Sequence, residues 1–160
     1  MTRGGWILAA LLLTASAPLA VAETGELYVP QLGDLMDAAQ TRHLKRYLAG
    51  KVQNWDLAAY DLERLRASLA QAAVLYGGIP VTNVTTAEPL QAVEDAIRGK
   101  DGHRFASTVA LLTDRCNACH QSMKRSFIVI RLPAGEPFGN QCFSRRNQQI
   151  NRRRKRMPSR

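Results

Sequence analysis

Apolar side chains recur at helical spacing in four stretches of the chain, and turn-forming residues separate these stretches. The first stretch runs from about Gln31 to Leu48, and Gly50 after it is a suitable helix stop. One face of this stretch carries Leu32, Leu35, Met36, Ala39, His43 and Tyr47. The second stretch begins near Asn54 or Asp56, either of which can cap a helix, and ends at Gly77-Gly78. Its apolar stripe consists of Ala58, Leu62, Leu65, Leu69, Ala72, Ala73 and Tyr76.

The other two stretches are predicted in the same way. The third is short, from Glu88 to Arg98 with Gly99 as its stop, and Thr85 to Glu88 before it have the form of a capping box. Its inward positions are Leu90, Val93 and Ile97. The fourth begins near Asp101 or Gly102. Its apolar face carries Phe105, Val109, Leu112, Cys116, Cys119, His120 and Met123.

Four helices joined by short turns predict an all-α fold, an antiparallel four-helix bundle. The part of the chain that would form it has about 120 residues, which is the size of one small domain. After the fourth helix, Phe127 to Ile130 form a short, mostly β-branched run, and Pro133 to Phe143 form a loop rich in proline and glycine.

The candidate chemistry lies at the end of the fourth helix. Cys116-Asn117-Ala118-Cys119-His120 has the form C-x-x-C-H, the attachment signature of a c-type haem. Two thiols three residues apart lie on one side of a helical turn, where they can add to the two vinyl groups of one porphyrin. His120 then offers an imidazole nitrogen to the iron. The sequence therefore predicts one haem c per chain, near the C-terminal end of the last helix.

Other uses of the two cysteines fit less well. A structural zinc site needs four ligands, and the remaining Cys142, His43 and His103 are not paired at ligand spacing. A thioredoxin-like redox pair needs a βαβ context, whereas the flanking sequence is helical in pattern. A disulfide between Cys116 and Cys119 stays open as an alternative, but it would leave His120 without a role.

The N-terminus has the pattern of a secretory signal peptide from Met1 to Ala22. Arg3 precedes an uncharged apolar stretch, and Ala20-Val21-Ala22 is a small-x-small cleavage site, so we expect the mature chain to begin at Glu23. An uncleaved membrane anchor is the alternative, but the apolar stretch is shorter than the roughly 20 residues that a spanning helix needs. A cleaved signal and a haem attachment motif together predict a periplasmic protein.

The net charge of +9 comes from the last residues of the chain. Residues 145–160 hold 8 basic residues and no acidic one, whereas residues 23–144 hold 13 of each sign. We therefore expect residues 23–143 to form the haem-binding domain and residues 144–160 to be a disordered basic tail. Its charge would suit an anionic surface or an acidic partner, and the periplasm argues against nucleic acid.

The position of the motif resembles that in the class II c-type cytochromes, the cytochrome c-prime group, where C-x-x-C-H also lies near the C-terminus of a four-helix chain. That group continues the motif as x-x-aromatic-basic, and here Met123 replaces the aromatic residue before Lys124. The segment FIVIRLPAGEPFGNQCF, with LGDLMDAAQTRHLK, NWDLAAYDLE and IPVTNVT, is similar to a proteobacterial family of small periplasmic cytochromes. The resemblance covers roughly Gly25 to Phe143, and the basic tail departs from it.

The second axial position of the iron distinguishes the functions that the resemblance implies. Low-spin class II cytochromes place a methionine of the first helix there, which here points to Met36, and His43 on the same face is the alternative. Two protein ligands suit a carrier of single electrons, whereas an open position suits binding of nitric oxide or carbon monoxide. The high-spin cytochromes c-prime illustrate that second possibility.

The leading hypothesis is an electron carrier whose partners are periplasmic or membrane-bound redox proteins. The resemblance also allows a homodimer. A third hypothesis is a subunit or docking module recruited through the arginine-rich tail. No pairing of a nucleophile with a base is present that would predict an enzyme.

Overall fold

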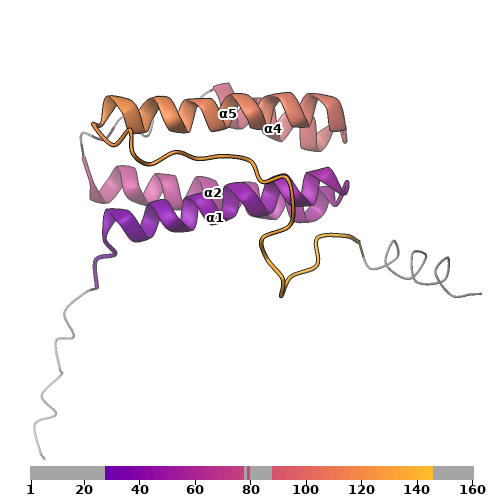
Figure 1. Cartoon of the computed structure of the whole chain (residues 1–160), viewed down its shortest axis with the longest axis horizontal. Helices are drawn as coiled ribbons and strands as arrows, with labels where there is room; N and C mark the ends of the chain where they lie inside the picture. The colour runs from indigo at the N-terminus through magenta and orange to yellow at the C-terminus, as the bar shows by residue number, and fades with distance from the viewer. Residues whose placement is uncertain (1–27, 78, 80–87, 146–160) are drawn as a thin grey trace, which may run out of the picture.

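The computed structural model describes residues 28–77, 79 and 88–145, and these residues form four helices and no strand (Figure 1). The helices are α1 Leu32–Lys51, α2 Trp55–Leu75, α4 Glu88–Arg98 and α5 Gly102–Ser122. The prediction of an all-helical bundle is confirmed at this level. The expected signal peptide, the first three residues of the expected capping box and the tail beyond Arg145 lie outside the described residues.

The helix starts agree with the polar residues that precede them. Asn54 precedes α2, and its side chain accepts a hydrogen bond from the Leu57 amide at 3.4 Å. Asp101 precedes α5, and its carboxylate accepts one from the Arg104 amide at 2.9 Å. Each side chain satisfies one of the amide groups that have no partner inside the first turn of a helix.

The end of α1 differs from the prediction, because Gly50 lies inside the helix. A Cβ at this position would overlap the ring of Phe105 on α5, so the glycine permits a close approach of two helices. The helix turns at Gln53 instead, where φ is 58°. The Asn54 amide bonds to the Ala49 carbonyl and the Gln53 amide to the Gly50 carbonyl, which is the Schellman pattern of helix ends.

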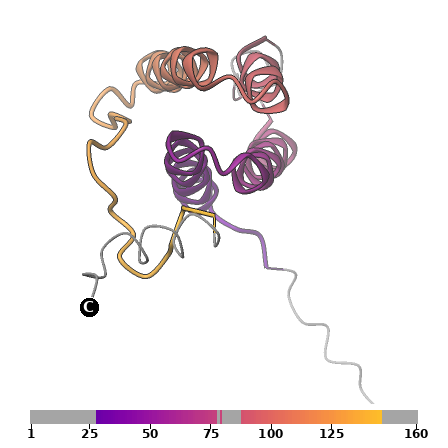
Figure 2. The same ribbon diagram turned by 90° about the vertical axis from the view of Figure 1, so that its right-hand side faces the viewer.

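The four helices lie side by side around a shared apolar core (Figure 2). α1 packs extensively along α2, and α4 packs along α5, whereas the contact between α1 and α5 is much smaller. The core contains most of the predicted inward residues. Its buried members include Leu62, Leu65 and Leu69 of α2, Leu90 and Val93 of α4, and Phe105, Val109 and Leu112 of α5.

The segment that follows α5, residues 126–145, is called the strap from here on. It has no helix or strand and runs back beside α5 and α1, on the side where these two helices have little contact (Figures 1 and 2). Its far end is anchored by Phe143, which is 1% exposed and whose carbonyl accepts a hydrogen bond from Asn54 Nδ2 at 2.9 Å. The strap is therefore part of the folded domain.

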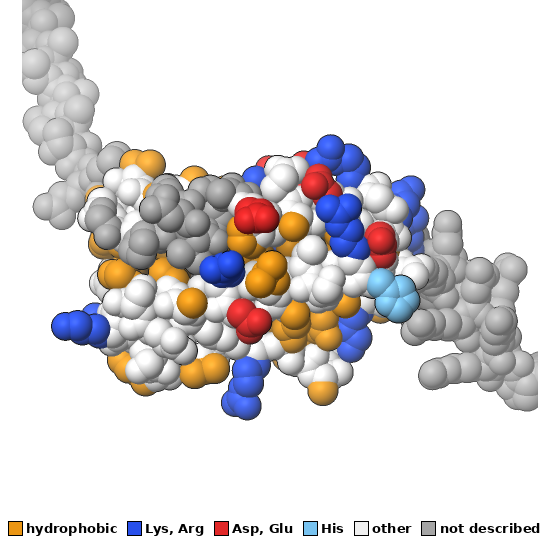
Figure 3. Space-filling model, turned by 90° about the horizontal axis from the view of Figure 1, so that it is seen from above, with side chains coloured by type: hydrophobic (Ala, Val, Ile, Leu, Met, Phe, Trp, Pro, Cys, Tyr) orange, Lys and Arg blue, Asp and Glu red, His pale blue; other side chains and the backbone are white. Residues whose placement is uncertain are grey.

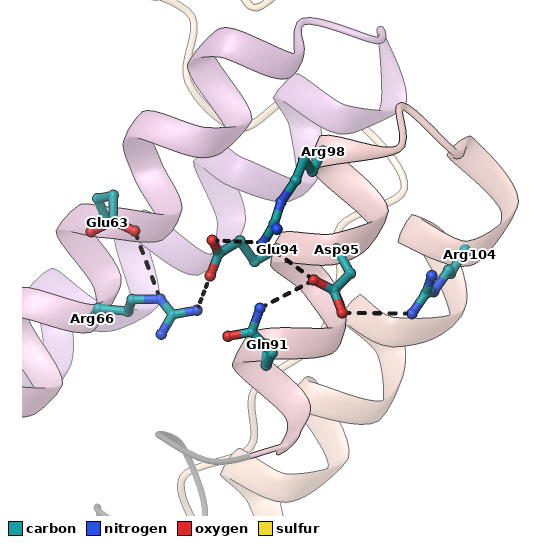
Figure 4. A network of polar contacts seen from close by, with 7 residues as sticks. All are labelled: Glu63, Arg66, Gln91, Glu94, Asp95, Arg98 and Arg104. Carbon is teal, nitrogen blue, oxygen red and sulfur yellow. Dashed lines mark hydrogen bonds and ion pairs between the residues drawn. The ribbon is translucent and has the colours of Figure 1, made fainter.

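The outer face over α4 and α5 carries cations and anions intermixed with apolar side chains (Figure 3). A network of ion pairs on this side joins α4 to both neighbouring helices (Figure 4). Glu94 of α4 bonds to Arg66 of α2 at 2.7 Å, and Asp95 pairs with Arg104 of α5 at 3.8 Å. Such surface pairs, of which Arg66–Glu94 is partly buried, contribute about 1 kcal/mol or less each, so they orient α4 more than they stabilise it.

Candidate functional site

The motif Cys116–His120 occupies the last two turns of α5. Neither Cys116 nor Cys119 is part of a disulfide. Cys116 is partly buried against the core, and burial raises the pKa of its thiol to about 11. Burial also raises the pKa of Cys119. Both groups are therefore neutral thiols near pH 7, on one helix and three residues apart.

The ring of His120 is held by the strap. Its Nδ1 atom lies 3.0 Å from the carbonyl oxygen of Ile128. A carbonyl only accepts hydrogen bonds, so Nδ1 carries the hydrogen, and in the neutral ring Nε2 keeps its lone pair. Histidines that bind metals commonly donate their other ring nitrogen to a backbone carbonyl in this way. The arrangement leaves Nε2 as the atom able to bind iron.

A second contact joins the motif to the strap at Ile130, two residues after Ile128. Asn117 Nδ2 donates to the carbonyl of Ile130 at 3.0 Å, and the Ile130 amide donates to Asn117 Oδ1 at 2.8 Å. Both hydrogen-bonding groups of one side chain thus pair with both backbone groups of one residue. This pairing fixes the strap in register with the last turns of α5.

A cluster of buried polar side chains lies between α1 and α5, one to two turns before the motif. His43 Nε2 is 2.8 Å from Thr113 Oγ1, and Thr113 in turn donates to the Val109 carbonyl at 2.9 Å. His43 Nδ1 is 2.6 Å from Arg46 Nη2. Since Arg46 only donates, Nδ1 accepts, and Nε2 carries the ring hydrogen toward Thr113.

The charge states in this cluster follow from its burial. Burial, followed by the nearby charge of Arg46, lowers the pKa of His43 to about 3, so the ring is neutral near pH 7. Burial lowers the pKa of Arg46 to about 10, and this side chain remains a cation. Burial raises the pKa of Asp61, against the opposing effect of its bond to Arg42 at 3.2 Å.

Arg46 is an incompletely satisfied cation inside the bundle. It is 0% exposed, and among the described residues its Nε and Nη1 atoms have no hydrogen-bond partner. The ionisable groups near enough to affect its pKa include Cys116 and Asp61, so Arg46 lies near the C-x-x-C-H motif. A buried guanidinium in this condition fits an additional carboxylate, such as a propionate of haem.

The structure separates the two candidates for the second axial position. His43 is buried at Thr113, with a hydrogen bond on each ring nitrogen. Met36 is partly buried, packs against the core and lies two helical turns before His43 on α1. Met123 is exposed beyond the end of α5, and His103 is exposed at its beginning.

Asn117 and Thr113 are functional candidates that the sequence pattern did not identify. Thr113 lies seven residues before His120, on the same face of α5, and this spacing was an available signal. Asn117 occupies a variable position of C-x-x-C-H, where no signal in the sequence indicates its bond to the strap. Arg46 lies three residues after His43, on the same side of the first helix. This spacing was likewise an available signal for its position beside His43.

No protein-family model, no curated protein and no solved structure matches this chain significantly. Among the described residues, no helix combines the length and apolar character needed to cross a membrane. Among these described residues, no group of three or more His, Cys, Asp or Glu side chains is placed to hold a metal ion.

Proposed function

We propose that this protein is a periplasmic c-type cytochrome that carries single electrons through one covalently attached haem. The observation that carries the proposal is the geometry of the motif. Two neutral thiols, Cys116 and Cys119, lie on the last turns of α5, and His120 beside them has its Nδ1–H held by a backbone carbonyl. This is the donor set that a haem c requires.

Each residue of the motif has a distinct role in this proposal. Cys116 and Cys119 would form the two thioether bonds, and His120 Nε2 would bind the iron. When bound, the haem supplies the one-electron redox chemistry. The protein keeps the His120 ring in one orientation through Ile128, and the packing of Cys116 against the core limits the access of water.

The contacts between α1 and α5 support Met36 as the second axial ligand. Gly50 faces Phe105, and His43 bonds to Thr113. Residues earlier in α1 therefore lie beside residues later in α5. Met36 is two turns before His43, and His120 is two turns after Thr113. In an antiparallel bundle this spacing would bring Met36 to the level of His120, which supports the proposal.

His43 is the weaker alternative. Binding iron through this ring would break its bond to Thr113 or its bond to Arg46, and it would leave a buried polar group without a partner. Such a loss costs about 1–3 kcal/mol. Met36 forms no comparable bond that ligation would break, because a thioether is at most a weak acceptor.

The first test is the absorption spectrum of the purified protein, ferric and ferrous, with and without carbon monoxide. We expect covalent haem with a low-spin spectrum, a near-infrared band of Met-to-iron ligation and no response to carbon monoxide. Substitution of both Cys116 and Cys119 by Ala should abolish covalent attachment. A wild-type chain without covalent haem contradicts the proposal.

The variant Met36→Leu tests the second ligand at nearly constant side-chain volume. We expect a high-spin spectrum, binding of carbon monoxide and a lower reduction potential. Met123→Leu is the matched control, because Met123 follows the motif on the exposed side, and its spectrum should equal that of the wild type. A high-spin wild-type protein that binds carbon monoxide would instead favour a gas-binding function.

A further inference from the structure

Asn117, in a variable position of the motif, uses both the donor and the acceptor of its side-chain amide in contacts with the strap. Its amide donates to and accepts from the backbone of one residue, Ile130, at 3.0 and 2.8 Å. Two such bonds fix both the distance and the direction of the strap. Asn117 is partly buried and Ile130 is buried, so water competes weakly for these groups.

The position of Ile130 determines the position of Ile128. The two residues are separated by one position, so in a chain without helix they lie within about 7 Å of each other. On α5, Asn117 and His120 are three residues apart and therefore neighbours on the helix surface. The pairing of Asn117 with Ile130 thus helps to hold the Ile128 carbonyl at His120 Nδ1.

A backbone turn also holds the start of the strap: the Ile128 amide donates to the Arg125 carbonyl at 2.9 Å, and the other polar contacts of the strap lie farther away. Lys51 reaches the carbonyl of Ala134 at 3.4 Å, and Asn54 holds the carbonyl of Phe143. Both anchor the strap to the opposite end of the domain, near the junction of α1 and α2. Besides His120 itself, Asn117 is the described side chain that bonds to the backbone of the strap here, and it holds the strap on the far side of Ile128 from that turn.

We propose that Asn117 is a positioning residue for the iron ligand: through the strap it holds the carbonyl that orients and polarises His120. This inference rests on the proposed function. A hydrogen bond from Nδ1 to a carbonyl makes the imidazole a stronger donor to iron and stabilises the ferric state. Loss of the contact should make the ring more mobile and raise the reduction potential.

The experiment compares Asn117→Ala with Asn54→Asp in haem-loaded protein. Asn54→Asp keeps the oxygen that caps α2 but removes the donor to Phe143, so it loosens the strap at its far end. The two readouts are the reduction potential, from a spectroelectrochemical titration, and hydrogen exchange at the Ile130 amide. We expect Asn117→Ala to raise the potential and to speed exchange at Ile130. We expect Asn54→Asp to leave both unchanged.

Three results would overturn the inference. One is faster exchange at Ile130 with an unchanged potential, which would show that the strap has moved without affecting His120. Another is an equal shift of potential in Asn54→Asp, which would indicate general loosening. The third is wild-type behaviour of Asn117→Ala in both readouts.

A second variant covers the case in which Asn117→Ala fails to take up haem. Asn117→Ser adds no charge, and its shorter side chain cannot bond to both backbone groups of Ile130. It should shift the potential in the same direction by a smaller amount, and an unchanged potential there would again contradict the inference. A wild-type chain without haem would instead overturn the proposed function, so the two failures are distinguishable.

Discussion

A neutral histidine and a charged arginine are buried together between the first and last helices. Each ring nitrogen of His43 has a partner, which explains why the side chain is tolerated in the core. Within the part of the chain that the structure describes, Arg46 lacks partners for two of its nitrogen atoms. At the scale of single residues, the cluster is therefore stable in only one protonation state, with His43 neutral.

This requirement predicts a loss of stability in mild acid. The pKa of His43 is about 3 in the folded protein, against 6.5 in the unfolded chain. The unfolded chain therefore binds a proton more readily between these values. The stabilisation is complete above pH 6.5 and is lost as the pH falls toward 3, by up to about 5 kcal/mol. Urea unfolding at several pH values measures the slope.

The variant His43→Gln isolates this contribution. Its amide can donate to Thr113 but does not titrate, so the difference in stability from the wild type should shrink as the pH falls from 7 to 5. The raised pKa of Asp61 acts in the opposite direction and is common to both proteins. A difference that stays constant across this range would show that His43 does not titrate as expected.

At the scale of the helices, three of the four that the structure describes end in the same way. α1, α4 and α5 each finish with a Schellman pattern, and the residue in the left-handed region is Gln53, Lys100 or Lys124. Glycine is the usual residue there. In α1 and α4, glycine instead stands at the nearby positions Gly50 and Gly99. For Gly50 the reason is its contact with Phe105.

The contact predicts opposite effects of one substitution at two glycines of α1. Gly50→Ala should destabilise the protein by about 1–3 kcal/mol, because the added methyl group must displace Phe105. Gly33→Ala meets no atom within 4 Å and should stabilise it by up to about 1 kcal/mol. Thermal unfolding of both variants checks the signs. Stabilisation by Gly50→Ala would show that α1 and α5 do not approach closely here.

At the scale of the whole molecule, the strap completes the domain. α1 and α5 have little direct contact, and the strap connects the last turns of α5 to the junction of α1 and α2. Phe143 inserts into the core at its end, where it lies against Phe138. The strap thus covers the side of the bundle that the proposed haem site occupies.

The stability of the domain should therefore depend on a residue outside its helices. Phe143→Ala should lower the free energy of unfolding by about 3–5 kcal/mol, as expected for a fully buried aromatic ring. Phe127→Ala in the same strap is the control, because Phe127 is 77% exposed, and its effect should stay within about 0.5 kcal/mol. Denaturant titration of both variants gives the comparison, and equal effects would contradict the packing of Phe143.

The helices could be predicted from local signals in the sequence. The period of apolar residues marked all four, and Asn54 and Asp101 marked two of their starts, because a cap acts within its own turn. The predicted core positions Leu62, Val93 and Phe105 are buried. Gly50 was misjudged because a glycine that ends a helix and one that admits a neighbouring ring have the same local pattern.

The amino-acid sequence by itself determined the helical stretches, their buried faces and the motif Cys116–His120, because each depends on residues close together in the chain. Only the tertiary structure decided that Arg46 is buried, that His43 is bonded to Thr113, and that Asn117 holds the strap beside His120. These contacts join residues brought together by packing of separate elements. No spacing along one element encodes which residue of another element it will meet.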